Sequence, residues 1–407
     1  MSVGNWTTTN LDAISGIRIG SSKAGIRQTV RDDIVLFELS KSTQLAAVFT
    51  NNKFCAAPVT LAKKHLAEAS PKYLLINSGN ANAGLGDLGL LSAKQCCEGL
   101  AILSESTDAT QVIPFSTGVI GEALPVNKLL SGLPAAFNSL AEGNWSKAAK
   151  GIMTTDTCEK GCSQTLVLDG EKITITGIAK GSGMIKPDMA TMLSYIATDM
   201  PISKSVLQTM LKTAVDLSFN SITVDGDTST NDAAVLMATA AVDIACIDSE
   251  QDPRYAEFLT VLIDVCQYLS EAIVRDGEGA TKLIKVRVEQ AGSVEDAREV
   301  AYTVAHSPLV KTAFFAADPN WGRILAAVGR AKIEYINTNE VSIYLNDTCI
   351  VKAGKRALDY TEDKGQSVMK QDEILVRICL AQGDFSAVIL TCDLSYDYVK
   401  INAEYRS

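Results

Sequence analysis

Short apolar segments alternate with amphipathic ones along most of the chain, and this alternation limits the possible folds more than any other sequence feature. Residues 45–50 and 73–77 are mainly apolar and are bounded by polar or glycine-rich turns, as buried strands are. Segments 90–103, 201–215 and 253–274 instead carry apolar residues at helical spacing. Many short strands with interspersed helices are typical of a layered α/β or α+β fold. The periodicity leaves the strand order open.

A β-hairpin is predicted around the dipeptide Asp169-Gly170. Aspartate followed by glycine suits a two-residue turn, and strand-like segments 164–168 and 173–178 flank it. The second strand runs into the glycine-rich and proline-containing stretch 181–187, which cannot continue as regular strand.

The length of 407 residues exceeds what one core usually organises, so more than one domain is expected. The pattern changes near residue 282. Segment 282–289 alternates apolar and polar residues, Ser293 begins a helical pattern, and strand-like segments 374–380 and 387–390 follow. We therefore expect a C-terminal domain over 282–407.

The charge balance and hydropathy exclude several classes of function. A formal net charge of -10 argues against non-specific nucleic-acid binding, which requires clustered Lys and Arg. No apolar run approaches the ~20 residues that a membrane helix needs. Residues 1–10 are polar and lack the basic-then-apolar pattern of a secretory signal. These features indicate a soluble, cytoplasmic protein.

The chain has only two histidines, which narrows its possible chemistry. His65 follows two lysines and is expected at the surface, and His306 ends a predicted helix, where a histidine is electrostatically favoured. Neither has the surroundings of a general base. Cys158 and Cys162 lack the spacing and the nearby histidine of a zinc site, so we expect no metal.

The dipeptide Ala190-Thr191 offers a base of another kind. If the peptide bond before Thr191 breaks, the new α-amine, with a usual pKa of ~7.7–8.0, can activate the threonine hydroxyl. The same hydroxyl could cut that bond by attacking the preceding carbonyl. Threonine is also common in ordinary strands, and taken alone the residue favours that simpler interpretation.

The surrounding motifs resemble those of the ornithine acetyltransferase family, which includes bifunctional glutamate N-acetyltransferases. KGSGMI at 180–185 and PDMATML at 187–193 are similar to its self-cleavage signature. Motifs in the family's order and spacing also occur at 77–83, 116–121, 153–157, 224–232, 274–282, 317–323 and 401–407. The resemblance implies a cut between Ala190 and Thr191. It gives an α chain, 1–190, and a β chain that starts with the nucleophile strand and helices of 191–281.

The resemblance also implies roles for individual residues. Thr191 is the expected nucleophile, and Thr117 with Gly118 the expected oxyanion hole, which stabilises the developing negative charge. The residues expected to bind substrate are Thr154, Lys180, Thr191, Glu278, Asn402 and Ser407. A lysine and a glutamate in one pocket suit an amino acid, which carries a carboxylate and an amine.

The family's fold and reaction complete the expectation. The fold is α/β, a central αββα sandwich with a smaller C-terminal α/β domain. The enzyme would transfer acetyl from N-acetylornithine to glutamate through acetyl-Thr191, without a cofactor, and acetyl-CoA is a possible second donor. The cleaved chains would assemble as an α2β2 heterotetramer.

Two alternatives remain open at this point. A self-processing amidase or aminopeptidase of related fold would use Thr191 for hydrolysis rather than transfer. A catalytically silent relative would bind an arginine-pathway metabolite without converting it.

Overall fold

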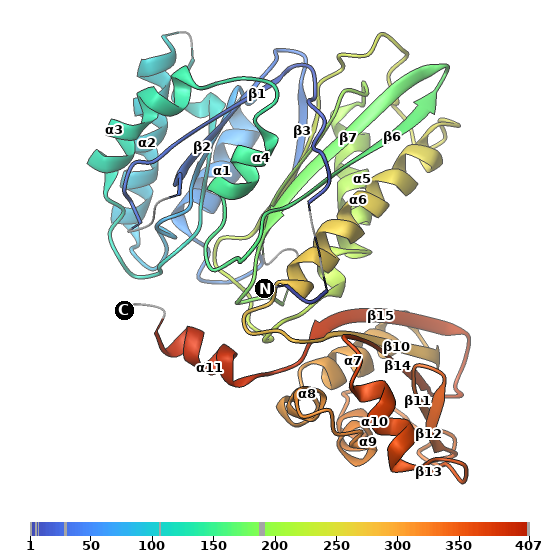
Figure 1. The fold of residues 1–407 in the computed structure, drawn as a ribbon. Coiled ribbons are helices and arrows are strands. Elements are labelled where there is room, and N and C mark those ends of the chain that lie inside the picture. Colours follow the sequence, from blue (N-terminus) through green and yellow to red (C-terminus); the bar gives the residue numbers. More distant parts are fainter. Residues whose placement is uncertain are drawn as a thin grey trace.

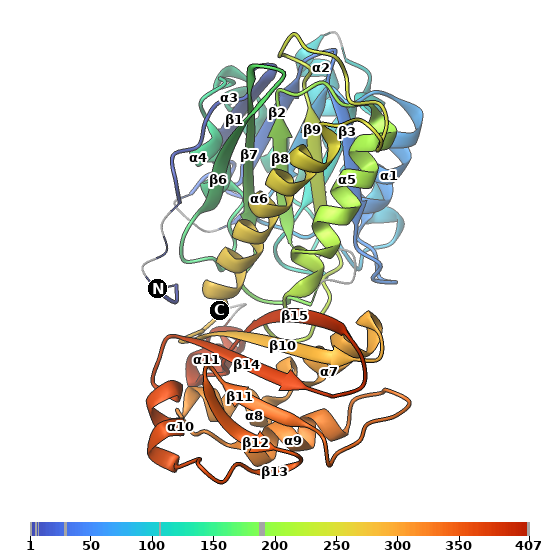
Figure 2. The same cartoon turned by 90° about the vertical axis from the view of Figure 1, so that its right-hand side faces the viewer.

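The structure, a computed structural model, describes residues 2–4, 6, 8–27, 31–105, 107–186 and 192–404. Figures 1 and 2 show a larger part that contains two sheets, and below it a smaller part that contains a third. Strands β1 to β9 and helices α1 to α6 build the larger part, and β10 to β15 with α7 to α10 build the smaller. The last helix, α11 (Tyr396–Ala403), leaves the smaller part and returns toward the larger one.

The first sheet has four strands in the order β1-β2-β4-β5. They are β1 (Ile17–Ser22), β2 (Ile34–Leu39), β4 (Tyr73–Asn77) and β5 (Val112–Ser116). Only the pair β4–β5 is parallel, and the long crossover between these two strands contains α2. The strand predicted at 73–77 is confirmed with both ends as expected.

The second sheet has five strands in the order β3-β9-β8-β7-β6. They are β3 (Gln44–Phe49), β6 (Lys160–Leu168), β7 (Glu171–Lys180), β8 (Leu193–Thr198) and β9 (Ala233–Ala238). Here β8 and β9 are parallel and the other neighbours antiparallel. The predicted hairpin is confirmed: β6 and β7 are joined by Asp169 (φ 52°) and Gly170 (φ 85°), two positive φ angles as in a type I′ turn.

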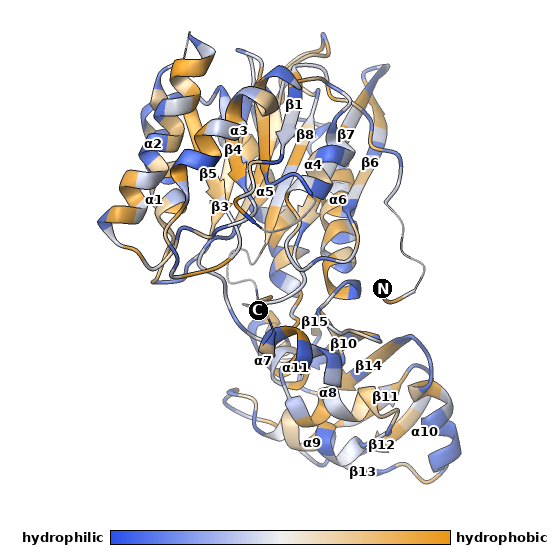
Figure 3. Ribbon diagram, turned by 60° about the vertical axis from the view of Figure 1, so that its left-hand side comes forward, coloured by the Kyte–Doolittle hydropathy of each residue, from blue (hydrophilic) through white to orange (hydrophobic). Residues whose placement is uncertain are grey.

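The two sheets pack face to face over an aromatic core. The Phe37 ring on β2 stacks 5.2 Å from the Tyr195 ring on β8, and Phe115 on β5 meets Tyr195 edge-on at 5.4 Å. Strands β4 and β5 are predominantly hydrophobic in Figure 3, because both strands are covered on their two faces and bury every side chain.

Helices cover the two outer faces and complete an αββα sandwich, as the family resemblance led us to expect. Helices α2 and α3 lie on the first sheet, and α5 and α6 on the second. The helices of this part are α1 (Ala57–Glu68), α2 (Asp87–Ser104), α3 (Val126–Asn138), α4 (Trp145–Gly151), α5 (Lys204–Asp216) and α6 (Tyr255–Arg275). Short 3-10 turns occur at Ala109–Gln111 and Phe219–Ser221.

Two details of the sequence interpretation are wrong. Helix α5 begins at Lys204 rather than at Pro201, because Ile202 forms a β-bridge with Ile247 and keeps the preceding residues extended. His65 is buried rather than at the surface. Its Nδ1 lies 2.8 Å from the carbonyl oxygen of Val112, on the face of α1 that packs against β5.

The smaller part is a mixed six-stranded sheet in the order β13-β12-β11-β14-β10-β15, with its own hydrophobic core. Its strands are β10 (Leu283–Ala291), β11 (Ser342–Leu345), β12 (Thr348–Lys352), β13 (Lys355–Arg356), β14 (Glu373–Cys379) and β15 (Phe385–Cys392). Its helices are α7 (Val294–Ala305), α8 (Pro308–Phe315), α9 (Trp321–Gly329) and α10 (Glu362–Met369). Among the described residues, no helix combines the length and apolar character required to cross a membrane.

Candidate active site

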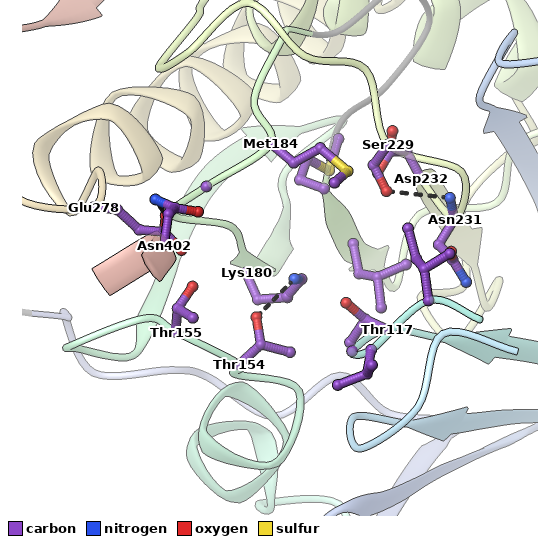
Figure 4. Close-up of a pocket in the computed structure, with 16 residues that line it drawn as sticks. Thr117, Thr154, Thr155, Lys180, Met184, Ser229, Asn231, Asp232, Glu278 and Asn402 are labelled. Carbon is purple, nitrogen blue, oxygen red and sulfur yellow. Dashed lines mark hydrogen bonds between the residues drawn. The ribbon is translucent and has the colours of Figure 1, made fainter. Parts of the chain in front are cut away.

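A cavity of about 250 Å³ opens where β5 and β7 end and β8 and β9 begin. Figure 4 shows its lining. The structure brings together six residues that were singled out from the sequence: Thr117, Gly118, Thr154, Lys180, Glu278 and Asn402. They are separated by up to 285 positions in the chain, so the fold rather than sequence proximity assembles this site.

Three expected site residues, Ala190, Thr191 and Ser407, lie outside the described residues. The described chain resumes at Met192, which itself lines the cavity together with Leu193, the first residue of β8. The cavity therefore borders the segment in which the cleavage position was expected.

The turn that carries Thr117 and Gly118 follows directly after β5 and is held tightly. The Thr117 amide donates to the Asn77 carbonyl at 2.9 Å. Gly118 adopts a φ of 133°, and a Cβ at this position would lie 2.7 Å from the backbone of Gly79 and Asn80. Only glycine fits that close approach, so the close packing of this turn leaves the Gly118 backbone itself at the cavity wall.

Lys180, at the end of β7, supplies the positive charge of the cavity. Its Nζ donates to the Thr154 hydroxyl at 3.1 Å. Burial lowers the pKa of Lys180, and the charges of Asp156 and Asp232 oppose that shift. A lysine in this state gains electrostatic energy when an anionic group enters the cavity.

Glu278 and Asn402 form another side of the site. The Asn402 side-chain amide donates to the Glu278 carboxylate at 2.8 Å, so the C-terminal helix α11 contacts the loop after α6. The Glu278 amide donates to Ser182 O at 2.9 Å, and a Cβ on Gly183 would lie 2.4 Å from the carboxyl carbon of Glu278. Gly183 therefore leaves the space that this carboxylate occupies.

A buried ionic cluster next to the cavity holds these loops in place. Lys160 Nζ lies 2.6 Å from both Asp156 and Asp276, and all three side chains are at most 1% exposed. Asp156 also accepts hydrogen bonds from the amides of Thr154 at 2.9 Å and Gly181 at 2.8 Å. One cluster thus ties together the loop of Thr154, the end of β7 and the loop after α6.

The segment that precedes the expected cleavage position is fixed by the loop before β9. The Asp225 carboxylate accepts from the amides of Met184 at 2.7 Å and Ile185 at 2.9 Å. The Thr228 hydroxyl donates to the Lys186 carbonyl at 3.0 Å. Asp225 and Thr228 lie after the expected cleavage position in the chain, and the segment they bind lies before it. These hydrogen bonds therefore connect the two sides of that position.

Sequence reasoning missed part of this site. Ser229, Asn231 and Asp232 line the cavity, yet their motif was recognised without a role for any of them. Asn231 bonds the carbonyls of Ala81 at 2.6 Å and Ser116 at 3.0 Å, and so joins the loop to the first sheet. The available signal was a polar run directly before a buried strand.

The fold and the cavity define a class of protein: an αββα sandwich with a cavity at the strand ends, lined by a lysine, a glutamate and an aspartate. The family model described as "ArgJ family" matches residues 18–407. The chain belongs to the ArgJ family.

Two curated relatives are similar to this chain over nearly its whole length. The "Arginine biosynthesis bifunctional protein ArgJ" of Methylococcus capsulatus is 52% identical over 404 residues, with 99% of this chain and 98% of that protein covered. The protein of the same name from Pseudomonas fluorescens is 50% identical over 407 residues, with 100% of both chains covered. The crystal structure of "Arginine biosynthesis bifunctional protein argJ" from Bacillus halodurans is 38% identical, with a TM-score of 0.51, and covers 53% of this chain and 100% of that one.

Proposed function

We propose that this ArgJ-family enzyme transfers an acetyl group from N2-acetyl-L-ornithine to L-glutamate in arginine biosynthesis. The observation that carries the proposal is the cavity itself. It combines a turn that carries a hydroxyl and a glycine backbone with one lysine and one glutamate, in a space suited to an amino acid. The curated relatives are named for arginine biosynthesis.

Self-cleavage between Ala190 and Thr191 is the first step of the proposed mechanism. It frees an α-amine beside the Thr191 hydroxyl and gives the chains 1–190 and 191–407. The fixed segment 184–186 supports this step, because a bond is attacked fastest when its approach geometry is held in advance.

Acetyl transfer then proceeds in two halves. The Thr191 oxygen attacks the acetyl carbonyl of N-acetylornithine, and the carbonyl oxygen, now negative, is stabilised by the Thr117 hydroxyl and the Gly118 N–H. Collapse breaks the C–N bond, the ornithine nitrogen takes a proton, and acetyl-Thr191 remains. Glutamate attacks this ester, forms the new C–N bond and releases the threonine hydroxyl.

The charged groups of the cavity orient the two amino acids. We assign the substrate carboxylate to Lys180 and Thr154, and the side-chain ammonium of ornithine to Glu278, which Asn402 holds in place. Ser407 and Thr191 complete the proposed binding set. The chemistry requires no metal or organic cofactor, and acetyl-CoA is an alternative acetyl donor.

An α2β2 heterotetramer of the cleaved chains, located in the cytoplasm, is the proposed form of the enzyme. Two measurements test the proposal as a whole. The denatured mass of purified protein should show two species that match 1–190 and 191–407. Incubation with N-acetylornithine and glutamate should yield N-acetylglutamate; release of acetate without glutamate would favour the amidase, and binding without turnover would favour the silent relative.

A further inference from the structure

Asp232 is a buried acid in the cavity that the mechanism above does not use. It directly precedes β9, lines the cavity and is 3% exposed. Its Oδ2 has no hydrogen-bond partner among the residues that the structure describes. A buried carboxylate oxygen left unpaired costs free energy, so a group that arrives with the reaction is the natural partner.

The backbone fixes the position of this carboxylate. The Asp232 carbonyl accepts from the Thr50 amide at 3.0 Å, and the next amide, that of Ala233, donates to Met192 O at 2.9 Å. The preceding side chain, Asn231, is bonded to the first sheet. The backbone on both sides of Asp232 is therefore held, and the side chain it carries is buried from solvent.

The burial of Asp232 favours a group that exchanges a proton. Burial raises the pKa of Asp232 well above its usual range, and a hydrogen bond with Ser229 and the Lys180 charge oppose that shift only in part. Lys180 already donates to Thr154. In the view of Figure 4, Glu278 and Asp232 lie on opposite sides of Lys180, so the cavity has a carboxyl group on each side of its lysine.

We propose that Asp232 is a second carboxyl subsite, which receives a protonated primary amine and removes its proton before the nitrogen reacts. The inference rests on the acetyl transfer proposed above. Glutamate arrives with an α-ammonium, which has no lone pair for attack. One proton passes to the Asp232 carboxylate, the freed lone pair forms the C–N bond, and the nitrogen's second proton goes to the departing Thr191 oxygen. Asp232 then releases its proton to water.

The amine could come from two sources, the acceptor glutamate or the new chain end that self-cleavage frees, and the experiment separates them. Asp232→Asn keeps the shape of the side chain and removes its ability to take up a proton. Asp227→Asn is the matched control, because Asp227 lies in the same loop but does not line the cavity. Self-cleavage, acetyl-enzyme formation and transfer to glutamate are measured separately by mass and by product.

We expect Asp232→Asn to cleave and to become acetylated, but to transfer acetyl to glutamate ~10²-fold or more slowly, the usual range for loss of a general base. Hydroxylamine is largely unprotonated at neutral pH, so transfer of the acetyl group to it should be nearly unchanged. A purely structural defect would instead slow transfer to both acceptors. If acetylation itself is lost after normal cleavage, the amine of the new chain end is the partner.

Equal glutamate transfer by Asp232→Asn and wild type would overturn the inference, as would equal losses with glutamate and hydroxylamine after normal acetylation. If Asp232→Asn does not fold, Asp232→Ser with added formate provides the same test, since formate should restore glutamate transfer. If added formate does not change the rate at which Asp232→Ser transfers acetyl to glutamate, the inference is also contradicted. Failure of the wild type to make N-acetylglutamate would instead overturn the proposed function.

Discussion

Two lysines of the fold, Lys160 and Lys180, have opposite electrostatic surroundings. Lys160 lies 2.6 Å from two carboxylates, and their attraction raises its pKa although burial acts to lower it. Lys180 has no carboxylate within 4.0 Å among the described residues and donates to one hydroxyl, and burial lowers its pKa. The protein pairs the charge of the first lysine, and the proposed function assigns the second lysine to the substrate. We expect this difference to separate lysines that support the fold from lysines that bind substrate.

Replacement of Lys160 should have the largest effect. Lys160→Met leaves Asp156 and Asp276 buried without their cation, which typically costs ~3–5 kcal/mol of unfolding free energy. Urea denaturation measures that loss. In the matched variant Lys150→Met, the lysine side chain is 61% exposed, and we expect a change below ~1 kcal/mol. Similar losses in both variants would show that the cluster is not a support.

Lys180→Met should give the reverse pattern. The variant removes a charge-assisted contact to the substrate carboxylate, worth ~1.5–3 kcal/mol, so KM for N-acetylornithine should rise about 10- to 100-fold. Unfolding free energy should stay nearly constant, because no ion pair is broken. Lys172→Met, an exposed change on the same strand, is the control and should leave KM unaltered. A large loss of stability would place Lys180 with the structural lysine instead.

Asp225→Asn tests a carboxylate that is fully paired yet adjacent to the cavity. An amide oxygen can accept from only one of the two amides, at Met184 and Ile185, that the carboxylate now serves. We expect self-cleavage to slow about 5- to 10-fold, the rate equivalent of ~1–1.4 kcal/mol. A time course of denatured mass measures it. Cleavage at the wild-type rate would show that the hold on this segment does not limit the reaction.

His306 should give the smallest effect, through pH. It lies against Thr223, with Nε2 3.0 Å from the hydroxyl, and burial lowers its pKa from 6.5 to about 4. The folded protein therefore prefers the neutral ring, so His306 stabilises it above pH 6.5 and loses that contribution as pH falls from 6.5 toward 4. His306→Gln should flatten the fall of Tm over this window. An unchanged slope would assign the acid sensitivity to other groups.

Much of the fold could be predicted because the local signals are strong. Helix α6 buries Leu262, Val265, Cys266, Leu269 and Ile273, a stripe at helical spacing, and Asp169-Gly170 has the turn chemistry of its hairpin. The strand order could not be predicted. The pairing of Phe49 with Ala233 joins residues far apart in the chain, and no local pattern encodes it.

The site residues also divide into those that sequence motifs revealed and those that only the folded structure reveals. Thr117, Lys180 and Glu278 were found because their motifs resemble a known family. Asp232 was not, because a carboxylate before a strand is an ordinary sequence feature until burial and a missing partner distinguish it. His65 was misplaced because two neighbouring lysines suggested a solvated face, whereas only contact with Val112 shows which side of α1 is covered.

The interleaved order of the second sheet has a consequence for the proposed cut at residue 190. Strands β8 and β9 from one side of that position lie between β3 and β7 from the other, so each fragment borders the other along two strands. The fragments cannot part without breaking the sheet. Once denatured, however, they diffuse as independent molecules. Refolding should therefore be second order in protein concentration after the cut and first order before it.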